Sequence, residues 1–182
     1  MNLCVGFLEL NSIAKGIEAA DRILKTAETE LLFAKAGCPG KYYILFSGEV
    51  AAVSSALEAG RETGGAHVVD SVVIPSVHPM VISAINQAVE PVPVNALGVM
   101  EFFSVTASIW AADAAVKAAE VDLMDVRLGT GIGGKSFVIL SGDVAAVHEA
   151  VGAGVRTAAE NGLLVGQVVI PNPKAEIFNS LL

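Results

Sequence analysis

The sequence is poor in charge, in aromatic side chains and in cysteine, and it contains no long apolar run. Only 16% of its 182 residues are charged, 5% are aromatic, and Lys and Arg form no cluster. A formal net charge of -8 without a basic patch argues against nucleic-acid binding. No stretch reaches the ~18 consecutive apolar residues of a membrane span, and the N-terminus MNLCVGFLEL lacks the basic start of a signal peptide. We therefore expect a soluble, intracellular protein that does not act at a membrane.

Apolar residues, in contrast, make up 53% of the chain. A chain so apolar and so low in charge is expected to bury surface against partners, which favours an obligate oligomer. The two cysteines, Cys4 and Cys38, form no disulfide framework and suit a reducing compartment.

The chain contains an internal duplication. Residues 5–36 align with 97–128 without a gap and are identical at 11 of 32 positions, and residues 41–65 align with 135–159 at 11 of 25. The motif VVIP recurs at residues 72–75 and 168–171. We place two homologous domains at residues 1–90 and 95–182, joined by the proline-containing linker Glu90–Val94.

Each repeat has the pattern strand, helix, strand, strand, helix, strand, short helix. In the first repeat we expect strands at 3–9, 29–36, 41–47 and 67–74, and helices at 12–27, 49–64 and 79–88, with Pro75 ending the fourth strand. Gly60 and Gly64 are small enough to let the second helix pack closely. The order βαββαβα predicts an α/β fold, a ferredoxin-like sandwich that occurs twice.

The loop between the second and third strands differs most between the repeats. The second repeat has Gly129-Thr-Gly-Ile-Gly-Gly-Lys-Ser136, which fits two phosphate-binding patterns, G-x-x-x-x-G-K-[ST] and G-x-G-x-x-G. Both sites need a helix directly after the loop, whereas the following residues 137–140 (FVIL) predict a strand. We therefore favour a glycine hairpin, and a nucleotide-binding or phosphotransfer enzyme that uses this loop is the hypothesis that we rank last.

The same loop of the first repeat contains Cys38, in the turn sequence Gly37-Cys-Pro-Gly40. Cys4 lies in an apolar strand and is expected to be buried, whereas Cys38 is expected to be accessible. One thiol per chain cannot hold a zinc ion or an iron–sulfur cluster, but three thiols on a threefold axis suffice for a [4Fe–4S] cluster with one open iron. From the residues alone, a functional Cys38 and an idle loop cysteine both remain open.

The other polar residues predict structural roles and no catalytic one. The histidines, His67, His78 and His148, are scattered and are expected at surface or cap positions, and no nucleophile motif occurs. The duplicated Glu9/Glu101 predict a duplicated structural contact. Asp21–Lys25 and Asp113–Lys117 are i,i+4 neighbours on a helix, which fits a surface ion pair or an interface contact. Core or sheet packing is the default for Tyr42 and Tyr43. No enzymatic activity is expected.

The two repeats resemble the shell domain of bacterial microcompartments, and the tandem arrangement resembles the trimeric class of that family, in particular its T-type members of propanediol utilisation. The resemblance covers nearly the whole chain. It rests on five segments, 8–16 (LELNSIAKG), 38–41 (CPGK), 69–71 (VDS), 78–79 (HP) and 131–135 (GIGGK).

The resemblance implies a structural tile in the shell of a cytoplasmic microcompartment. Three chains would form a pseudohexameric homotrimer that meets neighbouring shell proteins edge to edge. The loops would line its central pore through Gly37, Cys38, Pro39, Gly40, Thr130, Gly131, Ile132 and Gly133. Cys38 of each chain would ligate one [4Fe–4S] cluster per trimer, for electron transfer across the shell to or from an encapsulated or cytosolic redox enzyme. The second hypothesis is a plain metabolite pore without a cluster.

Overall fold

The computed structural model describes residues 3–87 and 95–179, so the expected linker Glu90–Val94 lies outside the described residues. The first repeat contains β1 (Leu3–Leu10), α1 (Ile13–Thr26), β2 (Thr29–Gly37), β3 (Lys41–Gly48), α2 (Val50–Gly64), a 3-10 turn (Gly65–His67), β4 (Val68–Val77) and α3 (Pro79–Ile85). The second contains β5 (Ala96–Phe102), α4 (Val105–Ala118), β6 (Val121–Leu128), β7 (Ser136–Gly142), α5 (Val144–Glu160), β8 (Leu164–Pro171) and α6 (Ala175–Asn179). The predicted order of elements is confirmed in both repeats.

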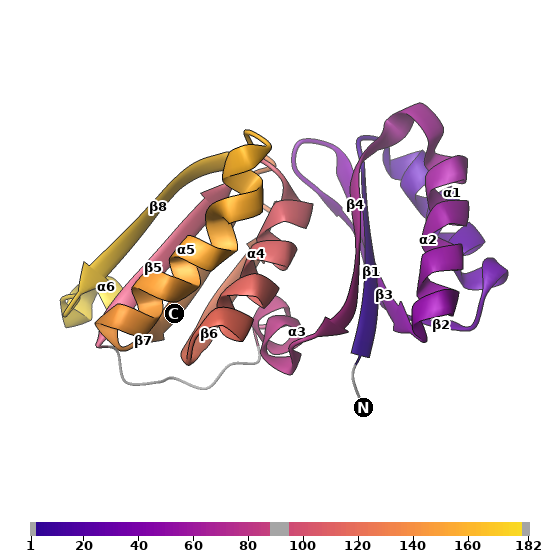
Figure 1. The fold of residues 1–182 in the computed structure, drawn as a ribbon. Coiled ribbons are helices and arrows are strands. Elements are labelled where there is room, and N and C mark those ends of the chain that lie inside the picture. Colours follow the sequence, from indigo (N-terminus) through magenta and orange to yellow (C-terminus); the bar gives the residue numbers. More distant parts are fainter. Residues whose placement is uncertain (1–2, 88–94, 180–182) are drawn as a thin grey trace. The chain divides into compact units, whose positions relative to one another are not determined.

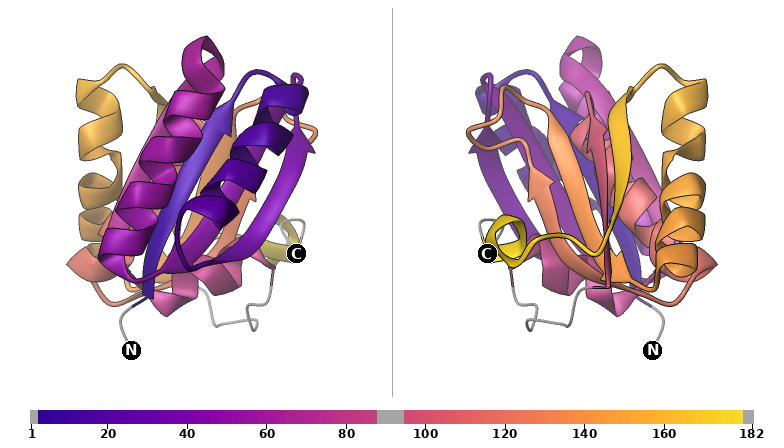
Figure 2. Two further views of the ribbon diagram at one scale, coloured as in Figure 1. Left: turned by 90° about the vertical axis from the view of Figure 1, so that its right-hand side faces the viewer. Right: turned by 90° about the vertical axis from the view of Figure 1, so that its left-hand side faces the viewer.

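Each repeat has one four-stranded antiparallel sheet. The strand order is β2-β3-β1-β4 in the first and β6-β7-β5-β8 in the second, as in a ferredoxin-like fold. Two helices pack on each other and on the sheet, α1 with α2 and α4 with α5 (Figures 1 and 2). A Cβ on Gly60 would lie 2.7 Å from Ile23, so the predicted close approach of α2 is confirmed.

The ends of the elements follow local side-chain chemistry. Ser12 and Ser104 cap α1 and α4 by accepting hydrogen bonds at 3.3 Å from the backbone N–H of Lys15 and Ala107. The prediction that Pro75 ends the fourth strand is wrong, because β4 continues to Val77. β4 is an edge strand with a register shift beside Pro75, and a proline is tolerated there.

Three large apolar side chains of α1 do not face the core of the first repeat. In α1 the buried residues are Gly16, Ala19, Ala20 and Ile23, whereas Ile13, Ile17 and Leu24 are exposed. Helical periodicity identified the helix correctly, but α1 has a second apolar face.

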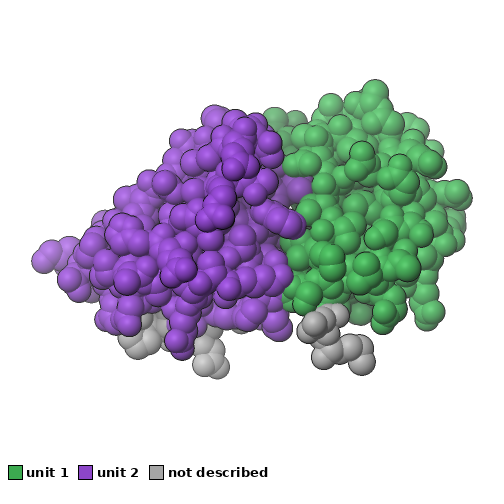
Figure 3. All heavy atoms as spheres, viewed as in Figure 1, with its two compact units in different colours: residues 1–77, 129–134 green, residues 78–128, 135–182 purple. Residues whose placement is uncertain are grey.

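The compact units do not coincide with the sequence repeats (Figure 3). One unit comprises residues 1–77 together with 129–134, and the other comprises 78–128 and 135–182. The glycine loop of the second repeat thus belongs to the first unit, and α3 of the first repeat belongs to the second. In the part of the chain that is described, no helix is long and apolar enough to cross a membrane.

Candidate functional site

The Cys38 turn connects β2 to β3 within the first unit. The backbone N–H of Gly40 donates to the carbonyl oxygen of Gly37 at 3.0 Å, and Gly40 has a φ of 81°, which favours glycine. The Cys38–Pro39 peptide bond is cis. Cys38 is half-buried, and Pro39 and Gly40 are exposed. The turn therefore holds the thiol at the end of a hairpin.

The glycine loop 129–134 lies against this turn in the same unit. The backbone N–H of Cys38 donates to the carbonyl oxygen of Gly129 at 3.1 Å. A Cβ on Gly134 would lie 2.6 Å from Pro39 Cδ and 2.7 Å from the Cys38 carbonyl oxygen, so only glycine fits there. Thr130, Gly131 and Gly133 are exposed, and Ile132 is half-buried. The structure thus brings the two predicted pore segments together, while their position at a pore stays a prediction.

The side chain of Tyr43 contacts the Cys38 turn. Its side chain is fully buried and stacks on Phe7 with ring centroids 6.2 Å apart. Its hydroxyl donates to the carbonyl oxygen of Cys38 at 3.2 Å. The ring occupies the space that a Cβ on Gly37 would take, and the hydroxyl the space of a Cβ on Gly129.

The environment of Tyr43 keeps its phenol neutral. Burial raises the pKa of Tyr43 above its ordinary value of 10.0, and the nearby Glu9 and Cys38 raise it further. The hydroxyl must be protonated to donate its hydrogen bond to the Cys38 carbonyl oxygen, so the raised pKa is consistent with this hydrogen bond. Packing in the sheet was the sequence prediction for Tyr43 and is confirmed, but the hydroxyl contact was missed. The signal for it was Phe137, the hydroxyl-free residue at the equivalent position of the second repeat.

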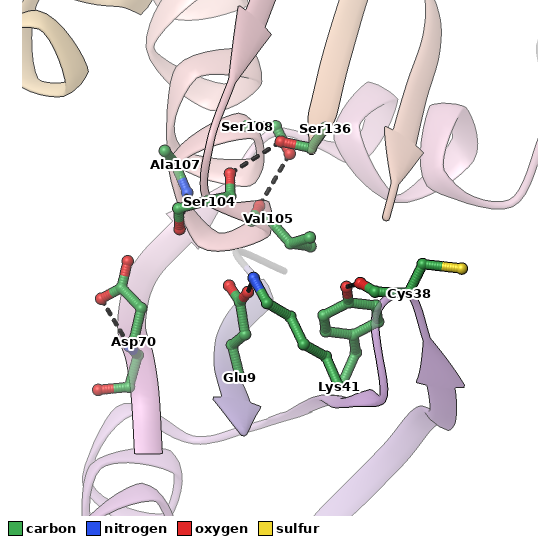
Figure 4. A network of polar contacts seen from close by, with 11 residues as sticks. Glu9, Cys38, Lys41, Asp70, Ser104, Val105, Ala107, Ser108 and Ser136 are labelled. Carbon is green, nitrogen blue, oxygen red and sulfur yellow. Dashed lines mark hydrogen bonds and ion pairs between the residues drawn. The ribbon is translucent and has the colours of Figure 1, made fainter. Parts of the chain in front are cut away.

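An ion pair adjoins the turn (Figure 4). Lys41 Nζ lies 2.5 Å from Glu9 Oε1, and the Glu9 side chain is fully buried. The equivalent pair of the second repeat, Lys135 and Glu101, has a distance of 2.6 Å. The predicted duplicated contact of Glu9 and Glu101 is therefore confirmed, and so are the i,i+4 pairs Asp21–Lys25 and Asp113–Lys117.

The phosphate-binding interpretation of the glycine loop has no structural support. The loop leads into β7, a strand, and not into the helix that either phosphate-binding pattern requires. The two residues that would contact phosphate are engaged elsewhere, since Lys135 pairs with Glu101 and the Ser136 hydroxyl donates to the Ser104 carbonyl oxygen at 2.8 Å. Four glycines of the loop have φ between 62° and 78°, as the hairpin interpretation requires (Gly129, Gly131, Gly133, Gly134).

The cysteines and histidines do not gather into a metal site within one chain. Among the described residues, no group of three His, Cys, Asp or Glu side chains is placed to hold a metal ion. Cys4 is buried as predicted, and burial, followed by the charge of Glu49, raises the pKa of its thiol. His78 caps α3, and His67 and His148 are exposed, which confirms the predictions for all three.

Sequence comparisons identify the repeats. The model of the BMC domain matches residues 4–77 and 96–173. The chain is 42% identical over 182 residues to the bacterial microcompartment shell protein PduT of Citrobacter freundii, an alignment that covers 100% of this chain and 99% of PduT. It is 41% identical over 84 residues to the shell protein PduA of the same organism, covering 46% of this chain and 87% of PduA. A relative of about one repeat in length thus matches one half of the chain.

Structural comparisons agree with this result. A crystal structure of a microcompartments protein from Desulfitobacterium hafniense DCB has a TM-score of 0.90 and 49% identity, and the alignment covers 98% of this chain and 99% of that one. A fused permuted hexameric shell protein of the RMM microcompartment has a TM-score of 0.66 and 27% identity, with 87% and 82% covered. The chain therefore belongs to the BMC-domain family and is a tandem-domain structural protein of a bacterial microcompartment shell.

Proposed function

We propose that three copies of the chain assemble into a pseudohexameric tile whose central pore is lined by the Cys38 turn and the glycine loop. Two BMC domains per chain give six domains in a trimer. The similarity of about half the chain to PduA, and of the whole chain to a fused hexameric shell protein, supports a ring built from six domains. The tile meets neighbouring shell proteins edge to edge, and the role is structural and not catalytic.

We further propose that the trimer binds one [4Fe–4S] cluster through three Cys38 thiolates. One chain offers one thiol of suitable placement, so the ligand set is complete only when three chains contribute. Figure 4 shows the Cys38 sulfur directed away from the Glu9–Lys41 pair, which leaves it available to a ligand beyond its own chain. Three thiolates leave the fourth iron to an external ligand.

The observation that carries this proposal is the way the backbone fixes Cys38. Its N–H donates to the Gly129 carbonyl oxygen, its own carbonyl oxygen accepts from the Tyr43 hydroxyl, and among the described residues its thiol makes no hydrogen bond. The chain thus restrains the peptide groups on both sides of Cys38, and the residue as a whole is half-buried. Such restraint lowers the cost of bringing three thiols to one site. When bound, the cluster would supply one-electron transfer, with a redox enzyme inside or outside the shell as partner.

Anaerobic reconstitution with iron and sulfide tests the cluster, followed by visible and EPR spectroscopy. The two cysteines offer a matched pair, Cys38→Ser and Cys4→Ala. We expect wild type and Cys4→Ala to give the absorption and the reduced-state EPR signal of a [4Fe–4S] cluster, and Cys38→Ser to give neither. Equal spectra from wild type and Cys38→Ser would remove Cys38 from the proposal.

A plain metabolite pore is the second candidate. It is favoured by the exposure of Thr130, Gly131 and Gly133. Two of these residues have no side chain, which leaves room for small molecules to pass. A colourless trimer that retains no iron after anaerobic purification and reconstitution would support this candidate against the cluster.

A further inference from the structure

The first repeat has a cavity of about 660 Å³ at the end of the β2–β3 hairpin that lies away from the Cys38 turn. Its lining comes from the beginning of β2, the end of β3 and the beginning of α2, and it includes Glu28, Glu30 and Glu49. Among the described residues, none of these three carboxylates makes a hydrogen bond or a salt bridge. The cavity is therefore bordered by acceptors whose donors do not come from the described chain.

Two hydroxyl groups of the lining also lack partners. Thr29 Oγ1 is buried and has no hydrogen-bond partner in the part of the chain that is described. Ser47 is only 2% exposed, and its hydroxyl makes no hydrogen bond with another described residue. A buried polar group without a partner costs about 1–3 kcal/mol, and native proteins satisfy such groups with a ligand, an ion or ordered water. These hydroxyls point to a bound molecule independently of the carboxylates.

The second repeat supplies a donor of its own at the same place. The residues at the equivalent positions are Asn95 for Leu3, Val121 for Thr29 and Asp143 for Glu49. Asn95 Nδ2 donates to Asp143 Oδ1 at 3.1 Å. The counterpart of Ser47, Ser141, is also unpartnered, so the repeats differ at the other positions. The first repeat has lost the amide donor, because Leu3 replaces it, and has gained an acceptor in Thr29.

The chemistry of the lining selects the ligand. Carboxylates only accept hydrogen bonds, so the complementary ligand is a cation with N–H donors. Among the described residues, no three His, Cys, Asp or Glu side chains are placed to hold one metal ion, so the glutamates suit a ligand that is long enough to reach them separately. Leu3 and Ala52 add apolar surface that suits a methylene chain. The cavity volume falls within the range of about 300–1,000 Å³ that is usual for small-molecule sites.

We infer that the first repeat binds an aliphatic polyamine in this cavity. Its ammonium groups donate to Glu28, Glu30 and Glu49, and one of them also donates to the Thr29 hydroxyl. The net charge of -8 raises the local concentration of such a cation. All lining residues belong to one unit of one chain, so the inference depends neither on the trimer nor on the cluster.

Isothermal titration calorimetry with spermidine tests the inference, in about 0.15 M salt to screen unspecific attraction. We expect wild type to bind one spermidine per chain. Glu30→Gln/Glu49→Gln should bind at least ~100-fold more weakly. The matched control is Asp122→Asn/Asp143→Asn, which removes two charges from exposed residues at the equivalent positions of the second repeat. Its affinity should stay within about twofold of wild type.

A third variant, Thr29→Val, tests the buried hydroxyl without a change of charge. It introduces the residue that the second repeat has at this position, and we expect spermidine to bind about tenfold more weakly. Circular dichroism establishes that each variant is folded, and Thr29→Val provides the test if a double variant does not fold.

Three results would overturn the inference. Wild type that shows no saturable binding of spermidine has no polyamine site. Equal weakening in the two double variants would assign the binding to net charge alone. Binding of Mg²⁺ that is as tight as that of spermidine, and equally sensitive to Glu30→Gln/Glu49→Gln, would show a metal site in place of a polyamine site.

Discussion

The two repeats place the same ion pair in different surroundings. In the first repeat Glu9 is 0% and Lys41 16% exposed, whereas in the second Glu101 is 38% and Lys135 42% exposed. The distances between the charged atoms are nearly equal, at 2.5 and 2.6 Å. The same pair of residues at the same distance can therefore contribute differently to the free energy of unfolding. The burial of the charges determines how much stability is lost when one partner is removed.

The loops of the two repeats differ in a second way. Tyr43 donates its hydroxyl to the Cys38 turn, whereas the equivalent Phe137 has no hydroxyl to donate. The loop of the first repeat is thus held by a hydrogen bond from a neighbouring strand, whereas the loop of the second repeat is a glycine hairpin. Of the two thiols in the described residues, only that of Cys38 is not buried, and it lies on this restrained turn.

The largest expected contrast is between Lys41→Met and Lys135→Met. Removing the cation beside the buried Glu9 should lower the free energy of unfolding by about 3–5 kcal/mol, whereas Lys135→Met should lower it by under about 1 kcal/mol. Urea unfolding followed by circular dichroism measures both losses at one protein concentration. Equal losses would show that burial of Glu9 does not distinguish the repeats.

The contact between the two loops is tested by Gly134→Ala against Gly131→Ala. Both glycines have nearly the same φ, 78° and 77°, so both variants carry a left-handed backbone penalty of about 1–2 kcal/mol. Only the Cβ at position 134 meets Pro39 and the Cys38 carbonyl, since nothing lies within 4 Å of one at position 131. Gly134→Ala should therefore cost about 3 kcal/mol.

Cys38 reports on the same pair of variants. We expect its rate of reaction with a disulfide reagent to change in Gly134→Ala and to stay at the wild-type rate in Gly131→Ala. Equal stability and equal thiol reactivity in both variants would show that the loops do not pack on each other in solution.

The smallest expected effect is that of Tyr43→Phe, with Tyr42→Phe as its control. Loss of the hydroxyl removes one hydrogen bond to the Cys38 turn and should cost about 1 kcal/mol at neutral pH. The thiol of Cys38 should react faster, because its turn is less restrained. A Tyr43→Phe chain that matches wild type in both stability and thiol reactivity would contradict the support role.

Alkaline unfolding gives Tyr43 a second readout. Because the pKa of Tyr43 is raised in the native chain, the native phenol keeps a proton that the unfolded chain loses near pH 10. The stability of wild type should then fall above pH 10, by up to about 1.4 kcal/mol per pH unit. Tyr43→Phe should show a shallower fall, and identical slopes would contradict the raised pKa.

The sequence predicted the elements because periodicity, caps and turn residues are local signals that the duplication supplies twice. It also predicted a duplicated structural contact for Glu9 and Glu101, since a carboxylate that recurs in both repeats points to a shared role, but it did not identify Lys41 and Lys135 as the partners. It could not predict that Ile17 is exposed and Ile109 buried, because helical spacing is the same for both and only tertiary contacts differ. The hydroxyl bond of Tyr43 and the membership of residues 129–134 in the first unit depend on the same long-range packing.

Iron content per chain in the trimer is the most direct test of the central claim that three Cys38 thiols hold one cluster. Anaerobically reconstituted protein is separated by size, and iron, sulfide and protein are quantified in the same fraction. We expect about four irons per three chains in wild type and none in Cys38→Ser, with both proteins eluting as trimers. A wild-type trimer without iron, or a Cys38→Ser trimer with the same iron content, would contradict the claim.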